Sequence, residues 1–160
     1  MAKAAIVMGS ASDYEVVQKS EDILKQFGIV YEIRIISAHR TPEEAFEFAK
    51  NAEKNGIEVI IAAAGKAAHL AGVLAGNTPI PVIGIPIKTS LMGGLDSLLS
   101  IVQMPKGVPV ATVAVDGAEN AALLAVQILS VKYPDLRAAF IEYKKAMRDE
   151  IIKKDEEFRK

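Results

Sequence analysis

Histidine, serine, arginine and aspartate residues stand in short polar runs, and each run follows an apolar segment. The first run is Gly9-Ser10-Ala11-Ser12-Asp13, and the second is Ser37-Ala38-His39-Arg40-Thr41-Pro42. A histidine titrates near neutral pH and can act as a general acid or base. An arginine beside it can bind a phosphate or a carboxylate through two parallel hydrogen bonds. The second run therefore indicates proton transfer on an anionic ligand.

The first run has the composition of a phosphate-binding loop. It supplies a tight turn, the hydroxyls of Ser10 and Ser12, and free backbone N–H groups at the start of a predicted helix. Asp13 could accept hydrogen bonds from ribose hydroxyls. The run is not a P-loop, since no Gly-Lys-Ser/Thr follows, and it lacks the G-x-G-x-x-G turn of dinucleotide-binding proteins. A structural alternative, in which Ser12 or Asp13 only caps the helix, stays open.

A third polar run, residues 65–69, carries the second of the two histidines in the chain. Lys66 is a cation at a predicted helix start, which is favourable only beside an anionic ligand. Each side chain also has a structural alternative: His69 could pack within its helix, Arg40 could pair with a nearby glutamate, and His39 could be a loop residue. Two histidines without a placed carboxylate are a weak metal signal, and no G-x-S-x-G turn supports a serine nucleophile.

Apolar runs and helical periodicities alternate along the chain and must position these loops. The predicted strands are 4–8, 30–36, 58–63, 81–87 and 108–115, and a helical pattern follows each of them. This alternation, with apolar strands, predicts a parallel sheet covered by helices on both faces. Five strands favour a three-layer α/β/α, doubly wound, flavodoxin-like sheet over an eight-stranded barrel, which needs roughly 250 residues.

In a parallel sheet, all strand-to-helix loops open at the same edge. The three runs and a fourth loop, residues 88–94, should therefore converge. With the usual strand order 2-1-3-4-5, strands 1, 2 and 3 are neighbours, so Ser10, His39 and His69 in the loops that follow them would lie around one crevice. We also expect Thr41 to cap the helix that starts at Pro42, with Glu44 as its capping-box partner.

Composition limits the class of protein. The chain has 160 residues, of which 51% are hydrophobic, a net charge of −1 and no cysteine. We expect a single domain over 1–160, with an α/β core over 1–131. The charge balance argues against nucleic acid and anionic membranes as partners, and there is no disulfide or thiolate metal site. Without a secretory segment or an apolar run long enough to cross a bilayer, a cytoplasmic location is expected.

The tail is predicted to be one amphipathic helix over 134–158. It is charged, but apolar residues recur at intervals of three and four, namely Leu136, Phe140, Tyr143, Met147 and Ile151. They form one stripe along the helix. The stripe packs either on its own domain or on a neighbouring subunit of a homo-oligomer, and a subunit interface is the expectation that we adopt.

With these runs in place, the sequence resembles class I N5-carboxyaminoimidazole ribonucleotide mutase, a family of de novo purine synthesis. The matching segments span nearly the whole domain in the expected order: 7–13, 37–42, 67–70, 81–86, 95–112 and 120–125. The segment through Val102-Gln103-Met104-Pro105 is highly specific. One loop departs from the family, which often reads Gly-Gly-Ala-Ala-His-Leu-Pro-Gly, because Lys66 and Ala71 replace a glycine and a proline.

The resemblance implies an isomerase that moves a carboxylate from N5 to C4 of an imidazole ribonucleotide, by decarboxylation and recarboxylation. It implies no metal and no organic cofactor, and a homo-octamer to which the C-terminal helix contributes. His39 would be the catalytic acid/base. The implied substrate-binding residues are Ser10, Ser12, Asp13, Ser37, Arg40, Gly65, Lys66, Ala67 and His69.

Two alternatives to the mutase remain. One is a carboxylase that joins free CO2 to aminoimidazole ribonucleotide. Members of that type tend to carry lysine after the histidine, so Arg40 favours the mutase. The other is a non-catalytic nucleotide-binding module. For the mutase, we expect the small side chains of Ala62, Ala63 and Ala64 to line the space that holds CO2.

Overall fold

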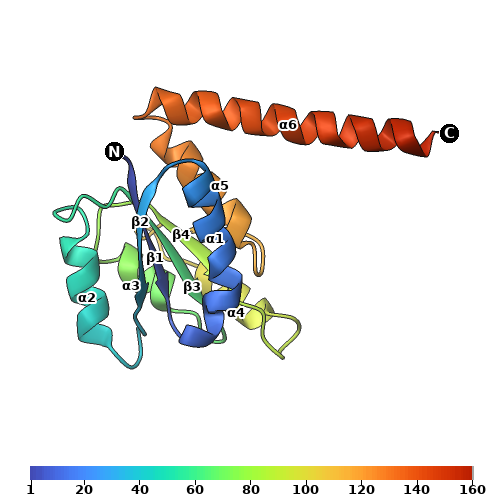
Figure 1. Ribbon diagram of the computed structural model, residues 1–160. Coiled ribbons are helices and arrows are strands. Elements are labelled where there is room, and N and C mark those ends of the chain that lie inside the picture. The colour runs from blue at the N-terminus through green and yellow to red at the C-terminus, as the bar shows by residue number, and fades with distance from the viewer. Residues whose placement is uncertain (160) are drawn as a thin grey trace.

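A five-stranded parallel sheet forms the centre of the computed structural model, which describes residues 1–159 (Figure 1). The strand order is β2-β1-β3-β4-β5, as predicted. The strands are β1 Lys3–Met8, β2 Val30–Ile35, β3 Val59–Ala64, β4 Val82–Pro86 and β5 Ala111–Thr112. The helices are η1 Ala11–Asp13, α1 Tyr14–Gln26, α2 Pro42–Asn51, α3 Leu70–Ala75, α4 Leu95–Val102, α5 Ala118–Leu129 and α6 Pro134–Phe158. This is the predicted doubly wound, flavodoxin-like α/β fold with a long C-terminal helix.

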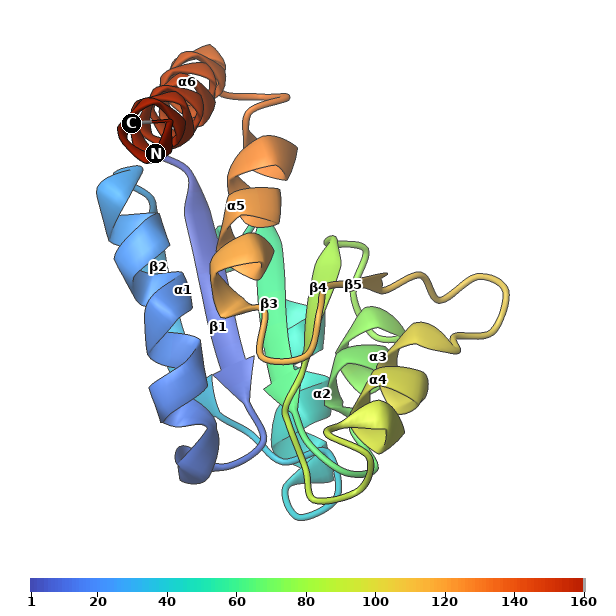
Figure 2. The same cartoon turned by 90° about the vertical axis from the view of Figure 1, so that its right-hand side faces the viewer.

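Helices cover both faces of the sheet, so the two cores lie on either side of it (Figure 2). Successive side chains of a strand point to opposite faces. In β1, Ala4 and Ile6 therefore pack against α1 and α5, whereas Ala5 and Val7 face α2 and α3. Strands β1, β3 and β4 are buried almost completely, which explains why their sequences are apolar without alternation.

The two edge strands, β2 and β5, differ from the prediction that all strands are buried and regular. Both are partly exposed, and β5 is short. In β2, Val30 and Ile35 are 42% and 57% exposed, because nothing pairs beyond this strand within residues 1–159. The predicted strand 108–115 is wrong in length, since β5 has only two residues. Pro109 has no N–H to donate to a neighbouring strand, and the chain turns at Gly107 with φ 97° before it reaches β4.

Gly84 in β4 gives α4 the room to approach the sheet. A Cβ atom here would overlap Cγ2 of Ile101 and lie 3.1 Å from Cγ1 of Val110. Because Ile101 is fully buried, it has no free space to move into. We expect Gly84→Ala to lower the free energy of unfolding by about 1–3 kcal/mol, measured by urea denaturation. Gly65→Ala is the control, since its Cβ would meet only ordinary contacts; equal midpoints for the two variants would contradict the expectation.

Helix α6 packs on the domain only over its first turns. Leu136 and Phe140 contact the core beside α1 and α5, and the rings of Phe27 and Tyr143 lie 5.6 Å apart. Beyond Tyr143 all described residues of the helix are exposed, and Figure 1 shows this part extending past the sheet. The apolar stripe of α6 is therefore divided. Its first half packs on the domain of the same chain, and its second half, with Met147 and Ile151, is exposed. Within residues 1–159, no helix combines the length and apolarity that a membrane span requires.

Candidate active site

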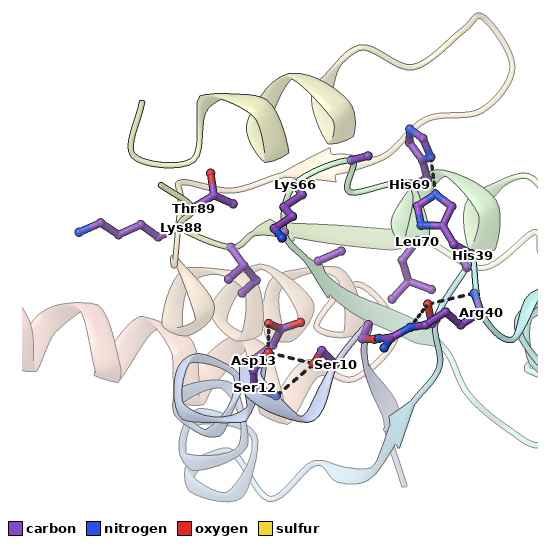
Figure 3. A pocket seen from close by; sticks show the side chains of 17 residues that line it. Ser10, Ser12, Asp13, His39, Arg40, Lys66, His69, Leu70, Lys88 and Thr89 are labelled. Carbon is purple, nitrogen blue, oxygen red and sulfur yellow. Dashed lines mark hydrogen bonds between the residues drawn. The ribbon is translucent and has the colours of Figure 1, made fainter. Parts of the chain in front are cut away.

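The four loops that were predicted to converge meet in a cavity of about 600 Å³ at the carboxyl edge of the sheet (Figure 3). The cavity is lined by all ten residues selected from the sequence: Ser10, Ser12, Asp13, Ser37, His39, Arg40, Gly65, Lys66, Ala67 and His69. Strands β1, β2 and β3 are neighbours in the sheet, and this brings their loops together. The structure thus groups the residues; the role of each stays a prediction.

The loop after β1 forms a compact hydroxyl and carboxylate cluster at the start of η1. Ser10 has extended backbone angles, and its Oγ accepts hydrogen bonds from the N–H and the hydroxyl of Ser12, at 3.3 and 2.9 Å. The hydroxyl of Ser12 also lies 3.3 Å from Oδ1 of Asp13. Ser10 is the N-cap of η1, whereas Ser12 lies inside η1 and Asp13 precedes α1 without a side-chain capping bond. The alternative that Ser12 or Asp13 caps the helix is therefore wrong, and all three side chains line the cavity.

The loop after β2 is closed by Thr41, but not in the predicted way. Thr41 precedes α2 as expected, yet its hydroxyl makes no capping bond to the helix. Instead, Oγ1 of Thr41 accepts from the N–H of Ser37 at 2.9 Å and donates to the carbonyl of Ser37 at 3.1 Å. The capping box with Glu44 is therefore wrong. Because the Thr41 side chain bonds back to Ser37, it stabilises the turn that presents His39 rather than the helix.

Arg40 is anchored to the cavity wall and makes no ion pair with the glutamates of α2. Its Nη2 donates to the carbonyl of Gly9 at 3.0 Å, and its Nε lies 3.3 Å from Oγ of Ser37. The backbone N–H of Arg40 also donates to that Oγ, at 3.2 Å. Since Ser37 Oγ accepts both bonds, its own proton remains available for a ligand. The remaining guanidinium N–H groups of Arg40 can bind an oxyanion.

The two histidines contact each other at the rim of the cavity. Nε2 of His39 lies 2.7 Å from Nδ1 of His69, and the ring planes are inclined by 71°. One ring must donate and the other accept, so at least one of these nitrogens carries no proton. Both side chains are exposed. This pair therefore offers a base and a proton donor side by side on a surface that a ligand can reach.

The loop after β3 takes a conformation that is unusual for its sequence. Lys66 has a φ of 56°, in the left-handed region that favours glycine. The carbonyls of Lys66 and Ala67 accept from the N–H groups of Ala68 and His69, at 2.9 and 2.8 Å. His69 is the N-cap of α3 rather than a residue inside it. These tight turns bring both Lys66 and His69 to the cavity.

The loop after β4 was predicted to converge with the others, but none of its side chains was predicted to belong to the site. Ile87, Lys88 and Thr89 line the cavity. The loop is held by a residue that was missed entirely: Oδ1 of Asp116 accepts from the N–H of Lys88 at 2.8 Å. Asp116 follows β5 with a φ of 56°. An aspartate after the fifth strand was the available signal, because that position belongs to the same sheet edge.

The expectation that three alanines would line the cavity is mostly wrong. Only Ala64 contributes to the lining. Ala62 and Ala63 are fully buried within β3, where their small side chains allow helices to approach the sheet. Ile87 and Leu70 supply the other apolar parts of the wall. Within residues 1–159, no three His, Asp or Glu side chains are grouped as metal ligands would be.

Asp13 is the buried ionisable group of the cavity. Burial raises the pKa of its carboxyl above the ordinary value of 3.8, and the charge of Asp116 acts in the same direction, while hydrogen bonds from Ser12 and Ser10 oppose it. The folded chain therefore disfavours the ionised form of Asp13 relative to the unfolded chain. Such a cost is typical of a residue kept for binding rather than for stability.

This cost leads to a pH-dependent prediction. Because the pKa of Asp13 is higher in the folded than in the unfolded chain, ionisation removes stability as pH rises from 3.8 through the raised value. Asp13→Asn carries no such charge. We expect this variant to have a higher Tm than the unchanged protein at pH 7, and the difference to shrink as pH falls toward 3.8. A Tm difference that is the same at both pH values would contradict the assignment.

Fold and site together define a doubly wound α/β protein with a polar cavity at the carboxyl edge of its sheet. Residues 3–150 match the family model of AIR carboxylase. The chain belongs to this family. It is 58% identical over 154 residues to the N5-carboxyaminoimidazole ribonucleotide mutase of Thermotoga maritima, covering 96% of this chain and 90% of the relative.

Other relatives agree in sequence and in structure. The mutase of Pyrococcus horikoshii is 59% identical over 149 residues, which is 93% of this chain and 84% of the relative. The crystal structure of Treponema denticola PurE superposes with a TM-score of 0.90 at 32% identity and covers 98% of each chain. The likeness thus extends over the sheet, the loops at its edge and the C-terminal helix.

Proposed function

We propose that this protein is an N5-carboxyaminoimidazole ribonucleotide mutase, an isomerase of purine synthesis that needs no metal or organic cofactor. The observation that carries the proposal is one cavity that combines a hydroxyl-rich helix start, an anchored arginine and a pair of histidines in contact. A ribonucleotide requires an anion site and a ribose site. A shift of carboxylate on its ring requires an acid/base at the other end.

The β1 and β2 loops bind the non-reacting part of the substrate. The hydroxyls of Ser10, Ser12 and Ser37 and the guanidinium of Arg40 bind the 5′-phosphate, beside the start of α1. Asp13 accepts hydrogen bonds from the ribose. The loop of residues 65–69 covers the base. What supports this arrangement is that the cluster and Arg40 are joined through Gly9, so both sides of the phosphate site move together.

The reaction requires two proton transfers, one to N5 and one from C4 of the substrate. The bond from N5 to the carboxylate carbon breaks, CO2 forms, and N5 gains a proton. The ring carbon C4 then attacks CO2, a carbon–carbon bond forms, and C4 loses its proton. Because gain and loss balance, a single residue can serve both halves, and His39 has this role. CO2 that stays beside C4 reacts far faster than CO2 recaptured from dilute solution.

An isotope experiment tests the function directly. The purified protein is supplied with substrate whose carboxylate carries 13C, in unlabelled bicarbonate buffer and without ATP. The mutase converts it to the C4-carboxylated product with the label retained. Conversion with loss of the label would instead support the carboxylase, which draws CO2 from solution. Binding without turnover would support the non-catalytic module. Failure to bind either ribonucleotide would overturn all three.

The protein is also proposed to act as a homo-oligomer, with an octamer as the expected form and the cytoplasm as its location. The chain forms one domain in this proposal, and the exposed half of α6 packs at a subunit interface. Supporting residues are Met147 and Ile151, which are 51% and 64% exposed on one stripe. Exposed apolar surface of this kind is unfavourable unless another chain covers it.

A double variant tests the role of this surface. We expect Met147→Asp with Ile151→Asp to lower the sedimentation coefficient of the oligomer, because two charges would have to be buried. Lys145→Asp with Lys153→Asp is the control on the same helix, where the side chains are already charged and exposed. A monomer for the unchanged protein, or an equal effect of both double variants, would contradict the interface.

A further inference from the structure

Lys66 has a backbone conformation that its side chain does not favour. Its φ of 56° lies in the left-handed region, where the Cβ of an L-residue crowds the following carbonyl. Glycine would adopt the same angle without strain. Strained residues of this kind cluster at binding sites, where the surrounding structure holds them. The reason for a lysine at this position should therefore be sought in what its side chain does.

The side chain of Lys66 lines the cavity and has no protein partner there. Figure 3 shows it directed toward the space between its own loop and Asp13. Within residues 1–159, no carboxylate lies within 4.0 Å of its ammonium. Three N–H donors therefore face the cavity without an anionic acceptor from the protein. An anionic ligand would supply one.

The proposed substrate carries two anionic groups. Of the three basic residues that line the cavity, Arg40 and Lys66 extend toward its interior, whereas Figure 3 shows Lys88 turned away. Arg40 is held 3.0 Å from the carbonyl of Gly9, beside the cluster that begins at Ser10. This places Arg40 with the phosphate. Lys66 lies on the opposite loop, three residues before His69, whose ring is 2.7 Å from His39. Lys66 thus shares a loop with His69, one of the two histidines proposed to lie at the reacting end.

We propose that the ammonium of Lys66 binds the carboxylate of the substrate and of the product, and so distinguishes carboxylated from uncarboxylated ribonucleotides. This inference rests on the proposed function. A charge-assisted hydrogen bond forms with a carboxylate but not with neutral CO2 or with the bare ring. Lys66 therefore favours the two carboxylated forms over the intermediate, and this limits the escape of CO2.

Binding of two ribonucleotides to the protein and its variants tests this role. The ligands are the C4-carboxylated product and uncarboxylated aminoimidazole ribonucleotide, measured by titration calorimetry. We expect Lys66→Met to weaken binding of the carboxylated ligand by about tenfold and to leave the other within about twofold. Lys66→Gly should lose the same selectivity. It also relieves the backbone strain, so it keeps the test independent of folding defects.

Lys88→Met is the matched control. It removes the same charge from the cavity rim, but Figure 3 shows its ammonium turned away from the other side chains. The inference is overturned if Lys66→Met weakens both ligands equally, which would assign Lys66 to the phosphate. It is also overturned if neither ligand is affected, or if Lys88→Met has the same selective effect. Failure of the unchanged protein to bind either ligand would instead remove the proposed function itself, together with this inference.

Discussion

Replacing His39 with asparagine should lower kcat by about 10²–10⁴-fold, because a positioned acid/base contributes an effect of this size. Asparagine is smaller and polar, so the ligand can still enter the cavity, although its amide is too short to replace Nε2 of His39 beside His69. It cannot take a proton from C4. We therefore expect the dissociation constant of the C4-carboxylated product to stay nearly unchanged. Steady-state turnover and equilibrium binding, measured on the same preparation, separate the two quantities.

The readout can be sharpened by following hydrogen exchange at C4 of the bound ring. If His39 moves this proton, the variant should exchange C4 hydrogen with solvent far more slowly than the unchanged protein. Turnover within tenfold of the unchanged protein would remove the role of His39. Loss of binding together with turnover would move His39 from proton transfer to ligand positioning.

Replacing Arg40 with alanine should act on binding instead of chemistry. In the proposed complex the guanidinium supplies charge-assisted hydrogen bonds to the phosphate, each worth about 1.5–3 kcal/mol. KM and the dissociation constant should therefore rise by about 10- to 100-fold. The value of kcat should change much less, because the phosphate lies away from the reacting atoms. A KM equal to that of the unchanged protein would remove Arg40 from the phosphate site.

Arg34→Ala provides the control for net charge. Arg34 lies on β2, the strand that precedes the loop of Arg40, but its guanidinium sits 5.8 Å from the centre of the Phe48 ring rather than in the cavity. Arg40→Lys adds a second test. It keeps the charge but cannot keep the bonds from Nε to Ser37 and from Nη2 to Gly9, so its KM should lie between those of the unchanged protein and Arg40→Ala.

The grouping of the site residues could be predicted because it depends on topology alone. Once β1, β2 and β3 were placed as neighbouring parallel strands, Ser10, His39 and His69 had to reach the same edge. The end of helix α1 could be predicted for a local reason, because Gly28 takes the left-handed angle just after it, with φ 65°. These inferences need no knowledge of which side chains touch.

The parts that could not be predicted depend on competition between contacts. Thr41 had two partners within reach, the helix and Ser37, and the sequence does not rank them. The length of β5 depended on the turn at Gly107 and on Pro109, which has no N–H to donate, and the chain pairs with β4 only at Ala111 and Thr112. The hydrogen bond from the N–H of Lys88 to Asp116 joins residues 28 positions apart, and no local sequence pattern links them. The left-handed angle of Lys66 contradicts its propensity, so the residues alone favour another conformation.

The division of helix α6 into a covered and an uncovered half has a consequence for how this protein should unfold. A chain that buries apolar surface only in the assembled state gains free energy by mass action. The Tm of the protein should therefore rise with protein concentration, while that of the Met147→Asp and Ile151→Asp double variant should not. If α6 packs at the proposed subunit interface, dilution should therefore lower the stability of a fold whose sheet and cavity lie away from the end of this helix.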